Sequence, residues 1–288
     1  MKLCRFVVGT ETRPRVGLAD EEGDGHIVDL SAEGIHSLTS ILEFEDLTGE
    51  LGRLSGLALP RFELGAIRFL VPVEHQEVWA AGVTYWQSKK ARMEESDFSA
   101  TAYDRVYDAE RPEIFFKSMP EKVVPTGEAV GIRRDARWNV PEPELVLVCN
   151  SRGQIAGFSI GNDMSSRDIE GENLLYLPQA KIYERSCAMG PFVVVGVSES
   201  EVREWRISSC ITREGAVVFQ GETTVGQIKR SFAELASFLF RSQKFPNGAC
   251  LLTGTVIVPE DTFTLHPADE VTIKISGIGT LTNHVVVV

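Results

Sequence analysis

The sequence predicts a mostly β fold with some α-helix, in which a small N-terminal α+β domain precedes a larger domain rich in strands. First, short runs of β-branched and apolar residues, separated by Gly, Asn, Asp and Pro, recur from about residue 144 to the C-terminus. Second, helical spacing or a helix-start signal is confined to a few stretches. Third, 288 residues are enough for one large domain or two smaller ones.

The composition excludes several classes of function. The formal net charge is −12, so the chain offers no basic surface to nucleic acid and no polybasic attraction to anionic lipid. The sequence contains no long apolar run and no export signal, so we expect no membrane partner and a cytoplasmic protein. The five cysteines form no CxxC pair, which indicates free thiols in a reducing compartment: Cys4, Cys149, Cys187, Cys210 and Cys250.

The first 70 residues are expected to form the small domain. Residues 3–30 alternate short apolar runs with turn-rich stretches, notably around residues 22–25, as in a small β-meander. Residues 38–51 carry apolar side chains at a spacing closer to helical. An extended connector bracketed by Pro60 and Pro72 follows, so we place the domain boundary near residue 70 and assign residues 71–288 to the larger domain.

Two stretches of the larger domain differ from its strands. Residues 86–111 are dense in Lys, Arg, Glu and Asp, which predicts a solvated helical segment or a mobile flap. Farther along, Ser231 and Glu234 have the spacing of a capping box in front of the apolar run LASFLF. This pattern predicts one helix among strands such as ELVLVC, FVVVG and VTIKIS.

A predicted β-hairpin brings three carboxylates together. The apolar run LVLVC ends before a turn at residues 150–153, and a second run, QIAGFSI, follows the turn. Glu142 and Glu144 project to the same side because strand side chains alternate with period two. With the turn at this place, Glu142 lies opposite Gly161 and Asp163 is its diagonal neighbour, at roughly 7 Å or less. A slip of one residue would turn Asp163 to the other face.

These three carboxylates form a candidate metal site. Like charges at such a spacing repel one another, and the cluster persists most readily when a cation neutralises it. Oxygen ligands favour a hard divalent ion over zinc, with Mg²⁺ first and Mn²⁺ or Ca²⁺ as alternatives. The competing interpretation is that Glu142 and Glu144 form an exposed strand edge with Lys or Arg partners.

The remaining motifs resemble a known family. Five segments occur in order from about residue 78 to the C-terminus: PEPELVLV, GFSIGNDMSSRDIEGEN, LPQAKIYERSCAMGP, LLTGT and SGIGTLTNHV. In this combination the chain resembles the fumarylacetoacetate hydrolase family. The resemblance implies a mixed β-roll core and a Mg²⁺ site formed by Glu142, Glu144 and Asp163.

The family resemblance alone leaves the reaction open, because this scaffold hosts hydrolases, decarboxylases, isomerases and dehydratases. Members that hydrolyse C–C bonds carry a His where this chain has Ser88, and no His lies between residues 76 and 265. The segments RPEIFFK and ENLLYLPQAKIY, with 18 residues between Glu144 and Asp163, resemble those of hydro-lyases in the family. They imply Mg²⁺-dependent dehydration of a 2-keto-3-deoxy pentonate to 2,5-dioxopentanoate in oxidative pentose degradation.

Two alternatives to this reaction stay open. One is a metal-dependent hydrolase that cleaves a C–C bond of an acylpyruvate or a 2,4-diketo sugar acid. The other is a catalytically silent metal-binding oligomer. Release of pyruvate would identify the hydrolase, and faster turnover of any 2-oxo acid with Mg²⁺ would exclude the silent oligomer.

The resemblance also implies roles for residues around the metal. Lys181 is expected to take the C3 proton, because a nearby dication and burial favour its neutral amine. Glu113 is expected to protonate the departing C4 hydroxyl, with a simple arginine pair as the alternative. A homo-oligomer, a dimer or a tetramer, is expected by the same resemblance. The residues expected to contact the small 2-oxo sugar acid are Lys117, Arg167, Tyr85 and Thr255, with a structural ion pair as the alternative for Arg167.

Overall fold

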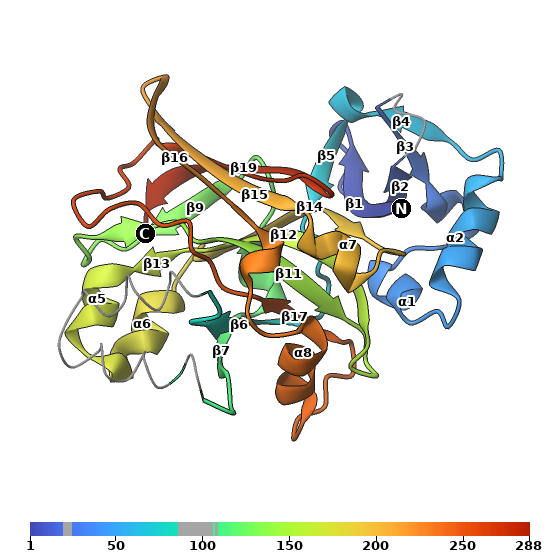
Figure 1. Ribbon diagram of the computed structural model, residues 1–288. Helices are drawn as coiled ribbons and strands as arrows, with labels where there is room; N and C mark the ends of the chain where they lie inside the picture. The colour runs from blue at the N-terminus through green and yellow to red at the C-terminus, as the bar shows by residue number, and fades with distance from the viewer. Residues whose placement is uncertain (20–24, 86–105, 107–108) are drawn as a thin grey trace.

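The computed structural model describes residues 1–19, 25–85, 106 and 109–288. Most of the turn predicted around residues 22–25 and most of the charged segment 86–111 therefore lie outside the described residues. In the described part, strands predominate and short helices lie around them, as the sequence predicts (Figure 1).

The N-terminal region is a β-meander that continues into the main sheet. Strand β1 pairs with β2 and β5, and also with β14 of the larger region, where Lys2 lies opposite Val194. Helices α1 and α2 begin at side-chain caps provided by Ser37 and Asp46. The boundary near residue 70 stays a prediction. The elements are β1 (Lys2–Val8), β2 (Arg15–Ala19), β3 (His26–Asp29), α1 (Leu38–Leu42), α2 (Leu47–Ser55), β4 (Arg61–Glu63) and β5 (Ile67–Leu70).

The main sheet has the strand order β4-β3-β2-β1-β14-β12-β11-β17-β6-β7, and β8 pairs with β14. Every residue of β11 is buried, because both faces of this strand are covered. Leu145 and Leu147 pack into one apolar cluster, whereas Val146 and Val148 pack into another that includes the N-terminal strands. The additional strands are β6 (Glu77–Gly82), β7 (Glu113–Ser118), β8 (Val123–Val124), β11 (Pro143–Cys149), β12 (Ile155–Asp163), β14 (Cys187–Val194) and β17 (Ala249–Leu252).

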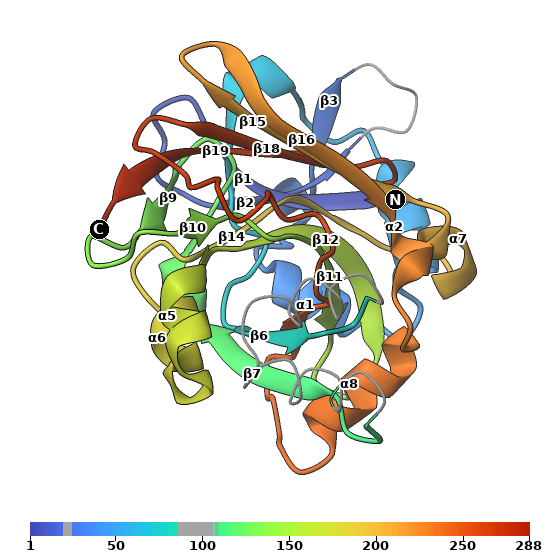
Figure 2. The same ribbon diagram turned by 60° about the vertical axis from the view of Figure 1, so that its left-hand side comes forward.

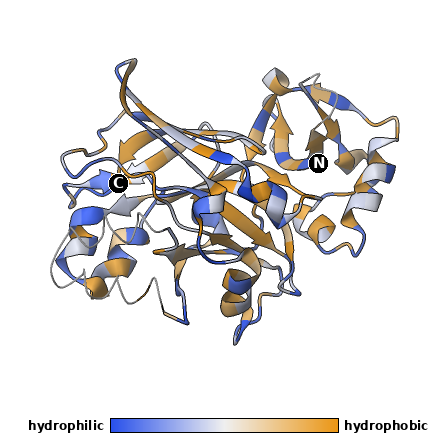
Figure 3. Cartoon of the chain, in the orientation of Figure 1, coloured by the Kyte–Doolittle hydropathy of each residue, from blue (hydrophilic) through white to orange (hydrophobic). Residues whose placement is uncertain are grey.

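A five-stranded sheet, β16-β15-β18-β19-β9, lies over one face of the main sheet (Figure 2). Ile207 and Ile273 of this sheet share an apolar cluster with Leu147 of β11. Hydrophobic residues are concentrated along the strands (Figure 3). Antiparallel and parallel pairs both occur, as expected for a mixed β-roll. These strands are β9 (Ala129–Ile132), β15 (Arg206–Arg213), β16 (Ala216–Thr224), β18 (Glu270–Ile275) and β19 (Gly279–Val287), and β10 (Asn139–Val140) pairs separately with β13 (Ser165–Ser166).

The hairpin of β11 and β12 differs in register from the predicted one. Glu144, and not Glu142, lies opposite Gly161, while the main-chain N–H of Asp163 donates to Glu142 O at 3.0 Å. Cys149 lies opposite Ile155 instead of Gln154, which shifts the register by one residue, and a β-bulge between Val148 and Cys149 shifts it by one more. Because the shift amounts to two residues, each side chain keeps its face and the three carboxylates remain together.

The predicted helix is present as α8 (Phe232–Phe240), and the Ser231 hydroxyl accepts from the main-chain N–H of Glu234. Three further helices are too short for their periodicity to be read from the sequence. Among the described residues, no helix is long and apolar enough to cross a membrane. The short helices are α5 (Arg167–Glu172), α6 (Leu177–Lys181) and α7 (Glu199–Arg203).

Candidate active site

A cavity of about 480 Å³ opens where the ends of β6, β7, β11 and β12 meet α5, α6 and the loop 254–262. Apolar side chains such as Phe115, Trp138 and Leu177 form part of its walls, and charged side chains form the rest. The predicted site residues that line this cavity are Glu113, Glu142, Glu144, Asp163, Arg167, Lys181 and Thr255.

The hairpin brings Glu142, Glu144 and Asp163 to one point. Glu144 lies on β11, Glu142 immediately precedes this strand, and Asp163 is the last residue of β12. All three side chains are buried, and one carboxylate oxygen of each lies within 4.8 Å of the others. Buried like charges at this spacing need positive charge nearby, and the all-oxygen donor set fits a hard divalent cation.

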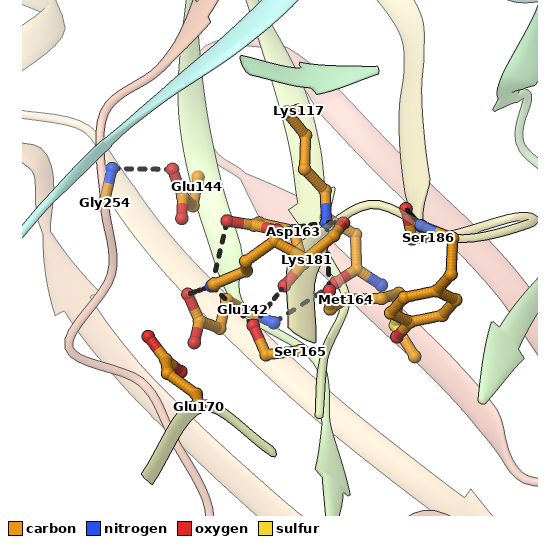
Figure 4. A network of polar contacts seen from close by, with 12 residues as sticks. Lys117, Glu142, Glu144, Asp163, Met164, Ser165, Glu170, Lys181, Ser186 and Gly254 are labelled. Carbon is orange, nitrogen blue, oxygen red and sulfur yellow. Dashed lines mark hydrogen bonds and ion pairs between the residues drawn. The ribbon is translucent and has the colours of Figure 1, made fainter. Parts of the chain in front are cut away.

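Lys181 supplies part of this positive charge. It is the last residue of α6 and is 2% exposed. Its Nζ donates to Glu142 Oε2 at 2.8 Å, to Asp163 Oδ2 at 3.0 Å and to Ser165 Oγ at 2.5 Å (Figure 4). The amine therefore lies between two of the three carboxylates, where it also faces the cavity.

Glu144 is positioned by the main chain of the loop after β17. The Gly254 N–H donates to Glu144 Oε2 at 2.6 Å. Gly254 has a φ of 86°, and a Cβ at this position would overlap the Thr84 hydroxyl, so glycine is needed here. Burial raises the pKa of Glu144 well above its usual value, and the negative charges of Asp163 and Glu142 raise it further. The ionised form of Glu144 thus requires additional positive charge.

Helix α5 brings two more charged side chains to the cavity. Arg167 Nη2 lies 2.9 Å from Glu142 Oε1, and Arg167 Nε lies 3.9 Å from Glu170 Oε2. The structural ion pair considered for Arg167 is therefore present, although Arg167 also lines the cavity. Glu170 lines the cavity, is 2% exposed and is not predicted by the sequence. Its spacing of three residues from Arg167 is the signal that places both on one helix face.

Glu113 and Thr255 lie on the walls around this cluster. Glu113 is the first residue of β7 and lies opposite Gly82 of β6. A Cβ at position 82 would overlap the Glu113 carboxylate, so Gly82 provides the space that this carboxylate occupies. The Thr255 hydroxyl accepts from the Ile257 N–H at 3.1 Å.

Lys117 and Tyr85 lie outside the lining of this cavity. Lys117 lies on β7, four residues after Glu113, and is fully buried against Asp163. Its Nζ lies 2.5 Å from Asp163 Oδ1, a placement that does not fit the predicted contact with substrate. Tyr85 is buried beside a different cavity, which Arg206 also lines. The placement of Tyr85 likewise does not fit a contact with substrate in the carboxylate-lined cavity.

The charges around the cluster do not balance without a further cation. Among the described residues, seven carboxylates line the cavity, whereas the cations are Arg167 and Lys181 of the lining and Lys117 behind Asp163. This leaves a formal excess of four negative charges, which a divalent cation would reduce. The carboxylates are Glu113, Glu142, Glu144, Asp163, Glu170, Glu260 and Asp261.

The chain is similar to known proteins over most of its length. The family model described as fumarylacetoacetate (FAA) hydrolase C-terminal matches residues 77–286. A probable 2-keto-3-deoxyxylonate dehydratase of Haloferax volcanii is 50% identical over 218 residues, 76% of this chain and 75% of that protein. A 2-dehydro-3-deoxy-D-arabinonate dehydratase of Saccharolobus solfataricus is 39% identical over 262 residues, 88% of this chain and 87% of that protein.

Similarity also extends to a solved structure. The 2-keto-3-deoxy-D-arabinonate dehydratase complexed with magnesium and 2,5-dioxopentanoate aligns with a TM-score of 0.82 and 34% identity. The alignment covers 100% of this chain and 99% of that one. The mostly β architecture predicted from the sequence is thus shared with a solved protein along the whole chain.

Proposed function

The chain belongs to the fumarylacetoacetate hydrolase family, and we propose that it is a hydro-lyase acting on a 2-keto-3-deoxy pentonate. We expect 2-keto-3-deoxy-D-arabinonate as substrate and 2,5-dioxopentanoate as product. The observation that carries this proposal is the position of the Lys181 amine, 2.8 Å from Glu142 and 3.0 Å from Asp163 in a cavity. Dehydration of a 2-oxo acid needs a base at this place, and the two dehydratases among the relatives support the substrate class.

Glu142, Glu144 and Asp163 are the proposed ligands of a divalent cation, Mg²⁺ in the first place and Mn²⁺ or Ca²⁺ as alternatives. The solved relative with magnesium and 2,5-dioxopentanoate supports this choice. Bound there, the cation would act as a Lewis acid toward the carboxylate and keto oxygens of a 2-oxo acid, which makes the C3 proton more acidic. Moving that proton is the task of the chain's own side chains.

Lys181 is the proposed base for the C3 proton. It can act only as a neutral amine, a form that a second cation beside it favours. Glu113, on the wall formed by β7, is the proposed acid: it gives a proton to the C4 hydroxyl, which then leaves as water. A proton shift from C5 to C3 of the unsaturated acid then gives the C4–C5 enol. Loss of the enol O–H proton and protonation at C4 complete the conversion to 2,5-dioxopentanoate.

Arg167 and Thr255 are proposed to position the reacting groups. Arg167 lies 2.9 Å from Glu142 Oε1 and so restrains one of the proposed ligands. Thr255 carries a hydroxyl on the cavity wall that can donate to a hydroxyl of the substrate while accepting from the Ile257 N–H. With these roles, the cavity can bind a sugar acid that carries hydroxyls at C4 and C5.

The test is turnover of 2-keto-3-deoxy-D-arabinonate with Mg²⁺, followed through a 2,5-dioxopentanoate dehydrogenase. We expect formation of 2,5-dioxopentanoate without pyruvate. Pyruvate from an acylpyruvate or a 2,4-diketo sugar acid, with no turnover of the pentonate, would instead identify the C–C bond hydrolase. Absence of turnover for every 2-oxo acid in the panel would identify a silent metal-binding protein.

We further infer a cytoplasmic homo-oligomer, dimer or tetramer, that acts in pentose catabolism. All five cysteines are free thiols in the structure, which suits a reducing compartment. Exposed apolar side chains on β16 and β19 offer surface for assembly: Val217, Val218 and Val287. Light scattering at micromolar concentration checks the assembly, and the mass of a single chain would contradict it.

A further inference from the structure

Lys117 is a fully buried lysine whose ammonium group has three polar partners, two carbonyl groups and one carboxylate. Its Nζ lies 2.5 Å from Asp163 Oδ1, and donates to Met164 O at 2.9 Å and to Lys181 O at 2.5 Å. The two carbonyl groups use two of the three donors of this ammonium group, and Asp163 pairs with its charge. Lys117 is buried outside the cavity lining, so its ammonium group meets these partners and not a substrate.

We propose that Lys117 is a positioning residue that holds the Asp163 carboxylate and the Lys181 main chain in a fixed relation. The inference rests on the proposed function, because it makes Lys117 a determinant of cation binding and of the geometry of Lys181. It replaces the contact with substrate that the family resemblance implies for Lys117.

The partners of Lys117 lie at the ends of two elements. Asp163 is the last residue of β12 and Met164 follows it, while Lys181 is the last residue of α6. The last carbonyl groups of a helix have no hydrogen-bond donor within the helix, and a lysine side chain from another element can donate to them. By donating to Lys181 O, Lys117 caps α6 and ties its end to the end of β12.

Asp163 lies between the two lysines (Figure 4). Its Oδ1 faces Lys117 and its Oδ2 accepts from Lys181, so the plane of the carboxylate is fixed from both sides. Lys117 and Asp163 are both buried, so loss of Lys117 leaves a buried carboxylate oxygen without this charged partner. The carboxylate is then free to turn away from Glu142 and Glu144. Partners that orient a metal ligand typically contribute about 10- to 100-fold to metal affinity.

Titration of metal-free protein with Mn²⁺ by calorimetry tests the proposal in Lys117→Met and Lys117→Arg. We expect the dissociation constant for Mn²⁺ to rise about 10- to 100-fold in both. A role through charge alone predicts the opposite for Lys117→Met, because removal of a nearby positive charge strengthens cation binding, and no change for Lys117→Arg. Lys122→Met is the matched control: Lys122 is exposed five residues farther on, so its loss should leave the constant unchanged.

Kinetics at saturating Mn²⁺ provide the second measurement. With Lys181 displaced and the substrate contacts intact, kcat of the Lys117 variants should fall while KM changes by no more than about twofold. A raised KM with an unchanged dissociation constant for Mn²⁺ would indicate that Lys117 contacts the substrate and would overturn the proposal. A lower Tm with unchanged Mn²⁺ affinity and kcat would show a merely structural lysine. Lack of Mn²⁺ binding by the wild-type protein would overturn the proposed function as well.

Discussion

Asp269 and Glu144 are both buried carboxylates, but they differ in how far neighbouring groups compensate their negative charge. Asp269, next to β18, accepts from Arg213 Nε at 2.8 Å, from Arg213 Nη2 at 2.7 Å and from the His266 N–H at 2.8 Å. Burial alone would raise its pKa, yet these hydrogen bonds lower the pKa of Asp269 below its usual value. The charge of Asp269 is therefore compensated where it lies.

Glu144 shares its surroundings with other carboxylates instead. Burial and the charges of Asp163 and Glu142 raise its pKa, and the Gly254 N–H and Lys181 offset only part of this effect. A carboxylate with its own arginine stabilises the fold, whereas a cluster with too few cations marks a place for a metal ion and for chemistry. Substitutions at the two places should therefore separate stability from activity.

The largest difference is expected between Glu144→Ala and Asp269→Ala. Glu144→Ala should lower kcat/KM about a thousandfold or more, equivalent to about 4 kcal/mol of transition-state stabilisation, because too few ligands remain for the cation. Asp269→Ala should leave kcat/KM within about twofold but lower the free energy of unfolding by about 1–3 kcal/mol, through lost charged hydrogen bonds. Kinetics and urea denaturation of both variants measure these effects. Equal loss of activity in the two variants would contradict the proposed difference between the two carboxylates.

Chelation should affect only the cluster. We expect EDTA to abolish turnover reversibly, with recovery on addition of Mg²⁺, because three carboxylates alone hold the proposed ion. The Arg213–Asp269 pair needs no metal, so the decrease of Tm caused by Asp269→Ala should be the same with EDTA and with Mg²⁺. Full activity after exhaustive chelation would contradict the metal site.

A smaller effect is expected from Gly82→Ala, which displaces the Glu113 carboxylate without removing it. Because a displaced acid protonates the leaving group less well, kcat should fall about tenfold or more while Tm changes little. Gly52→Ala is the control: Gly52 lies in α2 with open space around it, so alanine should raise stability by up to about 1 kcal/mol and leave kcat unchanged. Unchanged kcat in Gly82→Ala would argue against Glu113 as the acid.

The smallest expected effects concern pH, and they have opposite signs. The lowered pKa of Asp269 adds stability above the usual value of 3.8, and this contribution is lost as pH falls through the lowered pKa. For Glu144, whose pKa is raised, metal-free protein should lose stability as pH rises from the usual value of 4.5 toward the raised one. Urea denaturation over a pH series checks both effects. Asp269→Asn should lack the loss of stability at low pH, and Glu144→Gln should lack the loss of stability as pH rises, which is the second loss. If Mg²⁺ left the second loss unchanged, the cluster would not be the place where it binds.

The carboxylate cluster could be predicted from the sequence because period-two alternation tolerates an error of two residues. The turn and the bulge next to Cys149 together shift the hairpin register by two residues, so Glu142, Glu144 and Asp163 keep one face. A bulge depends on how neighbouring strands pack, so the sequence of one hairpin does not reveal it. The predicted fold class likewise depends on strand patterns that local sequence carries.

The surroundings of the cluster were harder to predict, because they depend on contacts between distant segments. Lys117 and Asp163 meet only once β7 and β12 are placed in space, and a lysine in a short strand gives no sign of burial. Glu170 reaches the cavity through a helix of six residues, too short for a periodic pattern. Tyr85 lines a neighbouring cavity that shares Val256 with the carboxylate-lined cavity. This placement also depends on contacts between distant segments, which the local sequence does not reveal.

Lys181 is proposed to move the C3 proton beside the carboxylate cluster, and deuterium exchange at C3 of the substrate tests this role. Wild-type protein with Mg²⁺ in D₂O should exchange the C3 protons of the substrate, as followed by NMR, whereas Lys181→Met should not. The Met variant should keep Mg²⁺ and substrate binding, because Glu142, Glu144 and Asp163 are intact. Lys122→Met should exchange like the wild type. Exchange at the wild-type rate in Lys181→Met would exclude Lys181 as the base and leave Glu113 or water in that role.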